Sequence, residues 1–360
     1  DLSGGITQQW NITNNGFLQR PPVTISGSEG GAWKKLKTAV HAAEDGDIIS
    51  ISGTITATNT GSSSNANFGN IDIKKNITIE KAAGASSAVL NANRSNLSTN
   101  AHPIFRVSGG KTLTLKNLTL KGGQNTTGAF GGAITVTGSS TAELTDCIIE
   151  DCQAKYGGAI GCYGGTTVTL TNTTIQKCKA TERGGAIYAS GATVTLTGCT
   201  LTGNEAVLKG GAIYAVKAGI SPTTPSAVTI SGGTIGGTDT NDANKATDSD
   251  DGIGGAIYIG EDCTLNMLNS AQLTGNTAAK KGGGVYAFGG TVNITNCTLK
   301  GNTANSGGAI YAVKNSTTPS TVTISGGTIG GAGADANKAT GTGADGKGGG
   351  ISISDGCTLT

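Results

Sequence analysis

The chain has 360 residues, of which 61 are glycine, 6 are proline and 13% are charged, and its formal net charge is +2. Proline is too scarce for collagen or for a disordered proline-rich tract, and the absence of a basic block argues against a nucleic-acid-binding protein. No apolar run is long enough to span a membrane, so we expect a rod that is not membrane-embedded. Threonine, serine and asparagine supply the polar surface instead of charged residues, which is typical of a β-solenoid.

The N-terminal third of the chain lacks an obvious repeat. Residues 1–31 end in a Gly/Ser-rich stretch and are interpreted as a lead-in or linker. In the next segment, residues 32–130, apolar residues at helical spacing predict a short amphipathic helix that caps the first coil and covers its open edge. The helical positions are Trp33, Leu36, Val40 and Ala43. Strands of the first irregular coils are predicted at 48–55, 71–79, 104–107 and 113–120.

From residue 131 onward the phrase Gly-Gly-Ala-Ile-Tyr, or a close variant, recurs. The copies begin at Gly131, Gly157, Gly184, Gly210, Gly254, Gly282, Gly307 and Gly348. Most successive copies lie 25 to 28 residues apart, and two steps are longer, at 44 and 41 residues. Self-similarity at such a period predicts a stacked solenoid.

Each unit of the segment 131–360 contains a Gly-Gly-Ala-Ile-Tyr strand, a Thr-Val-Thr-Leu-Thr strand and a Cys-Thr-Leu-x-Gly-Asn-x-Ala strand, separated by turns. Three strands per coil and a period of about 26 residues predict an all-β parallel β-helix. The last residues, 357–360, match the middle of a unit, so we expect a continuation beyond the C-terminus of this chain.

Strand parity predicts which side chains enter the core. Paired apolar residues such as Ile257 and Ile259, or Val194 and Leu196, point inward, and the residues between them point outward. Tyrosines occupy the outward position of the first strand in five units: Tyr188, Tyr214, Tyr258, Tyr286 and Tyr311. Stacked about 4.8 Å apart, they predict an aromatic strip that binds sugar rings or a protein partner. The alternative is that the rings stabilise the sheet by cross-strand packing.

The turn after the third strand carries a repeated asparagine. Asn204, Asn276 and Asn302 predict a structural ladder of hydrogen-bonded amides, and Asn244 and Asn337 are expected to continue it in the long units. Cys152 and Cys178 replace asparagine in two adjacent earlier units. Two cysteines stacked on adjacent coils are a possible disulfide, and the alternative is a pair of buried thiols.

The two long units begin at Gly210 and Gly307 and lengthen at corresponding places. Insertions in phase predict loops on one side of the rod, which is often the binding side. The first insertion also carries acidic residues: Asp239, Asp242, Asp248, Asp250 and Asp251. They favour a solvated loop over a calcium site. Without a Cys/His ligand cluster, we predict no metal and no cofactor.

With these phrases located, residues 131–360 resemble the polymorphic outer-membrane proteins of chlamydiae and similar bacterial surface proteins. That family repeats Gly-Gly-Ala-Ile/Leu/Val and Phe-x-x-Asn, and Leu201, Leu273 and Leu299 stand where the family has Phe. The resemblance implies a right-handed parallel β-helix that forms the passenger of an autotransporter. It also implies an extracellular protein on the bacterial surface or outer membrane, used in adhesion and virulence.

The sequence and the resemblance together predict a non-enzymatic adhesin, a monomeric rod that binds a host or neighbouring-cell surface protein or glycan. Three alternatives remain. A polysaccharide lyase or hydrolase can share this fold, but it needs paired outward carboxylates, and no such pair recurs, so no catalytic residue is assigned. The regular outward threonines, such as Thr169 and Thr195, are the pattern of ice-binding proteins. A passive stalk needs no binding site at all.

Overall fold

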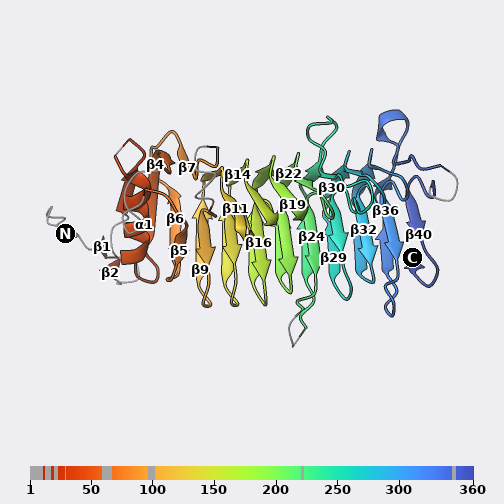
Figure 1. The fold of residues 1–360 in the computed structure, drawn as a ribbon, viewed down its shortest axis with the longest axis horizontal. Helices are drawn as coiled ribbons and strands as arrows, with labels where there is room; N and C mark the ends of the chain where they lie inside the picture. Colours follow the sequence, from red (N-terminus) through yellow and green to blue (C-terminus); the bar gives the residue numbers. More distant parts are fainter. Residues whose placement is uncertain are drawn as a thin grey trace.

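The computed structural model is an elongated rod, with its first described strands near one end of the long axis and its last strands near the other (Figure 1). It describes residues 11–12, 18–19, 23–28, 30–58, 67–95, 102–219, 223–342 and 346–360. Much of the predicted lead-in, 1–31, lies outside these ranges. Within it, β1 (Asn11–Ile12) and β2 (Leu18–Gln19) pair antiparallel, whereas β3 (Val23–Ser26) pairs in parallel with β4 (Ile48–Thr56). The solenoid therefore begins inside the segment predicted as a linker.

The strands stack in register into four columns, which we number sheets 1 to 4 in the order in which one coil visits them. Sheet 1 begins with β5 (Ile71–Ile73) and β8 (Phe105–Val107). It continues with the strands of the Gly-Gly-Ala-Ile-Tyr phrase and its variants: β12 (Ile134–Val136), β16 (Ile160–Tyr163), β20 (Ile187–Ser190), β24 (Ile213–Val216), β28 (Ile257–Ile259), β32 (Val285–Phe288), β36 (Ile310–Val313) and β40 (Ile351–Ile353). Sheet 2 contains β3, β4, β6 (Ile77–Lys81), β9 (Thr112–Lys116), β13 (Thr141–Thr145), β17 (Thr167–Thr171), β21 (Thr193–Thr197), β25 (Ala227–Ser231), β29 (Thr264–Leu268), β33 (Thr291–Thr295), β37 (Thr321–Ser325) and β41 (Thr358–Leu359). All pairings within these columns are parallel, as the repeat predicts.

Sheet 3 contains β7 (Ala88–Asn91), β10 (Thr119–Lys121), β14 (Ile148–Glu150), β18 (Thr174–Gln176), β22 (Thr200–Thr202), β26 (Thr234–Gly236), β30 (Gln272–Thr274), β34 (Thr298–Lys300) and β38 (Thr328–Ile329). Strand β4 runs through sheets 2 and 3 and joins them at the N-terminal end. Sheet 4 contains β11 (Gln124–Phe130), β15 (Gln153–Tyr156), β19 (Lys179–Arg183), β23 (Glu205–Ala206), β27 (Lys245–Ala246), β31 (Thr277–Ala278), β35 (Thr303–Ala304) and β39 (Lys338–Ala339). A short 3₁₀ helix spans Gly333–Asp335. Sheet 4 is formed by a short fourth strand in each of these coils. The sequence pattern did not separate this strand from the third strand of the coil.

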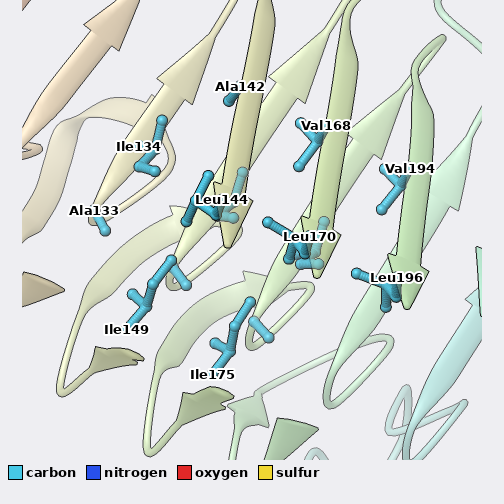
Figure 2. Packing of buried hydrophobic residues seen from close by; sticks show 14 of the residues in the cluster. Ala133, Ile134, Ala142, Leu144, Ile149, Val168, Leu170, Ile175, Val194 and Leu196 are labelled. Atoms are coloured by element: carbon cyan, nitrogen blue, oxygen red, sulfur yellow. The ribbon is translucent and has the colours of Figure 1, made fainter. Parts of the chain in front are cut away.

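The core of the rod consists of the inward residues of successive coils, stacked on like residues. In Figure 2, Leu144, Leu170 and Leu196 lie in one column of sheet 2, and Val168 and Val194 lie in the next. These residues are at most 1% exposed, which confirms the predicted strand parity. Continuous columns of Ile, Leu and Val bury apolar surface at every step of the stack, and this burial is the main source of stability.

The Gly-Gly dipeptide is explained by two steric restrictions. Gly210 has φ +67°, and a Cβ atom there would lie 2.3 Å from the carbonyl oxygen of Ile213. At Gly211 a Cβ atom would lie 2.0 Å from the carbonyl oxygen of Gly255 in the next coil. The first glycine therefore permits the left-handed turn into sheet 1, and the second permits adjacent coils to approach each other.

The predicted capping helix is present as α1 (Ala32–Ala42), which packs against β3, β4 and β5 at the N-terminal end of the rod. Trp33 is fully buried, and its indole Nε1 donates to the carbonyl oxygen of Gly69 at 2.9 Å. The backbone N–H of Gly69 donates to Nε2 of His102 at 3.0 Å, and Nδ1 of His102 lies 2.9 Å from the Pro103 carbonyl oxygen. This arrangement requires a neutral imidazole, with the proton on Nδ1.

Acidification is expected to weaken this cap. Burial lowers the pKa of His102, and the positive charges of Lys37 and Arg106 act in the same direction. Because the unfolded chain takes up the proton first, the free energy of unfolding should fall as the pH drops below about 6.5. Urea denaturation at a series of pH values, with Trp fluorescence as the signal, measures this effect. The effect should disappear in His102→Gln and persist in His41→Gln, which changes an exposed histidine of the same cap; equal pH dependence in both variants would contradict it.

Candidate functional site

The five predicted tyrosines lie in one column on the outer side of sheet 1. Ring centroids of Tyr188, Tyr214, Tyr258, Tyr286 and Tyr311 are 4.7 to 5.5 Å apart along the stack. Adjacent ring planes differ by 3° to 20°. Strand register fixes this arrangement, because Tyr214 pairs with both Tyr188 and Tyr258. We call the outer surface of sheet 1, with these rings and the side chains along their two sides, the tyrosine face.

The rings are much less accessible than the predicted aromatic strip requires. Tyr188, Tyr214, Tyr258 and Tyr286 are only 6 to 9% exposed, and Tyr311 is half-buried. Side chains along both sides of the column pack against the rings: Phe130, Tyr156, Val216, Ile253, Phe288 and Val313. The ring faces are therefore covered by neighbouring rings and by these side chains, and only a small part of each of the first four rings remains exposed.

Burial also sets the chemistry of the tyrosine hydroxyls. It raises the pKa of Tyr214 and of Tyr286 to about 12, and it raises the pKa of Tyr258 further. The phenols are consequently neutral at every physiological pH. They can donate and accept hydrogen bonds, but they are poor acid–base groups near neutrality.

Cationic side chains line one side of the ring column. In four of the eight units the residue just before Gly-Gly is cationic. Bridge pairings place Arg183 beside Lys209, and Ile253 between Lys209 and Lys281. The Arg183 guanidinium carbon lies 5.5 Å from the Tyr214 ring centroid, and Lys209 Nζ lies 5.6 Å from that of Tyr258. Lys281 Nζ lies 4.8 Å from the centroid of Tyr311. These cations were not predicted from the sequence, although their fixed position before the Gly-Gly phrase is visible there.

The asparagine ladder is present and continuous across five coils. Each side-chain Nδ2 donates to Oδ1 of the next asparagine at 2.9 to 3.0 Å, in the order Asn204, Asn244, Asn276, Asn302 and Asn337. The same Nδ2 groups donate to backbone carbonyls, such as Ile235 for Asn276. Asn204, Asn244, Asn276 and Asn302 are fully buried, and every amide is satisfied by these bonds.

Two protein-family models match parts of this chain. A family model described as the right-handed beta helix region matches residues 45–235, more than half of the chain. The chain belongs to the right-handed beta helix family. A second family model, for the Chlamydia polymorphic membrane protein repeat, matches residues 296–313, which include Asn302 and the Gly-Gly copy at Gly307. The predicted resemblance is confirmed by this match. No curated protein and no solved structure matches the chain.

The cysteines of this right-handed beta helix protein are free thiols within the described residues. Cys152 and Cys178 lie on adjacent coils, where the N–H of Lys179 donates to the Cys152 carbonyl oxygen at 2.9 Å. Both are fully buried, and burial raises the pKa of Cys178 well above its ordinary value. The structure thus has the alternative arrangement, two thiols, at the possible disulfide. Cys178 also ends the ladder, because its N–H donates to Oδ1 of Asn204 at 3.0 Å.

The in-phase insertions of this beta helix project at two edges of the rod, not at one side as predicted (Figure 1). One group of loops connects sheet 1 to sheet 2. The other group lies immediately before and after the sheet 4 strand in the chain. In the acidic loop, the Asp248 carboxylate accepts the N–H groups of Asp250 and Asp251 at 2.9 and 2.8 Å, so it stabilises a turn. Over the residues described, no group of three or more His, Cys, Asp or Glu side chains has the arrangement of a metal site. The described helices are all too short or too polar to cross a membrane.

Proposed function

We propose that this protein is a non-enzymatic rod displayed on a bacterial surface, and that it binds a host or neighbouring-cell surface protein or glycan through the tyrosine face. The match to a membrane-protein repeat family supports surface display. The expected autotransporter passenger role, with export to the outer membrane, forms part of the same proposal. A solenoid of this kind offers an extended face whose groups repeat at a fixed spacing.

One observation carries the proposal: the register of sheet 1 holds five rings in a single line along the axis, and parallel bridges hold the flanking cations beside them. The ring planes are covered, so a ligand would contact ring edges, hydroxyl groups and the flanking side chains. Aromatic residues with a polar tip, next to arginine, are the groups enriched in protein interfaces.

Two variants with the same replacement test which face binds. Val216→Glu places a carboxylate beside the ring column, and Thr195→Glu places one on the outer side of sheet 2, where Thr195 is also half-buried. The labelled chain is applied to arrayed host matrix proteins and glycans. We expect binding by the natural chain and by Thr195→Glu, and loss of binding by Val216→Glu.

Each other outcome contradicts a specific part of the proposal. Equal loss in both variants, or in neither, would place recognition away from the tyrosine face. No binding by any variant would favour a passive stalk. Incubation with acidic and neutral polysaccharides tests the enzymatic alternative, because release of reducing ends or unsaturated products would identify a hydrolase or a lyase.

A further inference from the structure

The cations of the tyrosine face are arranged in a way that folding alone does not favour. Arg183 and Lys209 are direct neighbours in a parallel bridge, and like charges in that position repel each other. In the described part of the chain, neither has an ion-pair partner, and the same holds for Lys281. By contrast Lys155, in the same region, is paired with Glu182 at 3.0 Å.

Partial burial increases the cost of this arrangement. The Nε atom of Arg183 is buried without a hydrogen-bond partner among the described residues. Burial lowers the pKa of Lys209, the charge of Arg183 lowers it further, and Asp251 opposes the shift. The cation–π contacts with Tyr214, Tyr258 and Tyr311 offset part of the cost. The remaining charge is available to an anion from outside.

We propose that the tyrosine face binds a linear anionic glycan through Arg183, Lys209 and Lys281. This inference rests on the proposed binding function and names its ligand class. The column of residues before Gly-Gly continues to Lys347, whose carbonyl oxygen accepts the N–H of Gly307. The carbonyl oxygen of Ser306 accepts the N–H of Gly282 in the same way, one coil earlier. Lysines thus stand at every second coil, at 209, 281 and 347.

The spacing of the column favours a glycan over an acidic peptide. Alternate coils lie about 10 Å apart, since parallel strands are separated by about 4.8 Å. This distance is close to the length of one disaccharide in an extended chain. A polysaccharide with an anionic group at the same place in every disaccharide would therefore present one such group to each lysine. Side chains on one face of an extended peptide repeat at about 6.8 Å, which matches neither one coil nor two. Sugar rings between the anionic groups would meet the edges of the tyrosines.

The test uses a heparin oligosaccharide of defined length, its chemically desulfated counterpart and poly-glutamate, with binding measured by calorimetry. The double variant Lys209→Met, Lys281→Met removes two charges and keeps unbranched side chains over the rings. The matched control is Lys116→Met, Lys177→Met, which removes two exposed lysines on other faces. We expect about tenfold weaker heparin binding for each tyrosine-face charge removed, little change in the control, and recovery in Lys209→Arg, Lys281→Arg.

Several results would overturn the inference. These are equal losses in both double variants, poly-glutamate binding as tight as heparin binding, or no recovery with arginine. If heparin does not bind but an arrayed neutral glycan or protein still binds in a manner sensitive to Val216→Glu, the anionic ligand is wrong and the proposed function stands. If nothing binds, both fail. Urea denaturation of each variant checks that the rod is intact.

Discussion

Replacement of Asn276 by alanine is expected to lower the free energy of unfolding by at least about 3 kcal/mol, because several buried groups lose their partners at once. The Asn276 amide donates to the Ile235 carbonyl at 2.9 Å and to Oδ1 of Asn302 at 3.0 Å. Its own Oδ1 accepts both the backbone N–H and the Nδ2 of Asn244. Each buried donor or acceptor left without a partner costs about 1–3 kcal/mol.

Urea denaturation measures this loss, with Asn241→Ala as the control. Asn241 is exposed in the first long unit, so its side chain should contribute little. If Asn276→Ala and Asn241→Ala have the same denaturation midpoint, water or a neighbouring group satisfies the vacated partners, and the ladder contributes nothing specific to stability. The comparison also tests whether the rod unfolds as one unit, since a broken central coil can separate its two halves.

Replacement of Gly211 by alanine is expected to be at least as damaging. The new Cβ atom would lie 2.0 Å from the Gly255 carbonyl oxygen and 2.5 Å from the backbone nitrogen of Lys245. Both are backbone atoms: Gly255 begins the next coil, and Lys245 lies near the end of the coil that Gly211 begins. They can move only if two stacked turns of the rod separate. A loss of more than about 4 kcal/mol, or failure to fold, follows from this clash.

Gly219→Ala is the matched control for this substitution. A Cβ atom at Gly219 has no heavy atom within 4 Å, and the change should be neutral or slightly stabilising. Thermal unfolding followed by circular dichroism distinguishes the two variants. A Gly211→Ala protein that melts at the temperature of Gly219→Ala would show that adjacent coils are not in close contact at the Gly-Gly phrase.

The fold was largely predictable because the same sequence pattern recurs in successive coils. Strand parity at Ile257 and Ile259 was enough to assign the inside of sheet 1, and both residues are fully buried. The repeated asparagine predicted the ladder, since a buried turn must satisfy its backbone groups. The fourth strand was harder to predict, because strands such as β23 are only two residues long and lack alternation.

The candidate site was predicted less well, because accessibility depends on neighbours from other parts of the coil. Parity placed Tyr258 on the outside correctly, but it carries no information on Ile253 or Lys209, whose side chains help cover the rings. Likewise, insertions at corresponding places in two units predict that their loops lie side by side. They do not predict the edge of the rod at which each loop projects. Both errors have the same cause: the spacing of a sequence repeat does not specify the path that the chain takes through each turn.

The ladder also gives the interior of the rod a direction. From Asn204 to Asn302, every side-chain amide donates toward the C-terminal neighbour, so the amide dipoles are aligned head to tail. Aligned dipoles polarise one another and strengthen the bonds in the middle of a chain more than those at its ends. The line of amides is therefore a cooperative unit with unequal members. An interruption at Asn276 divides it into two shorter and weaker segments, whereas an interruption at Asn204 merely shortens it.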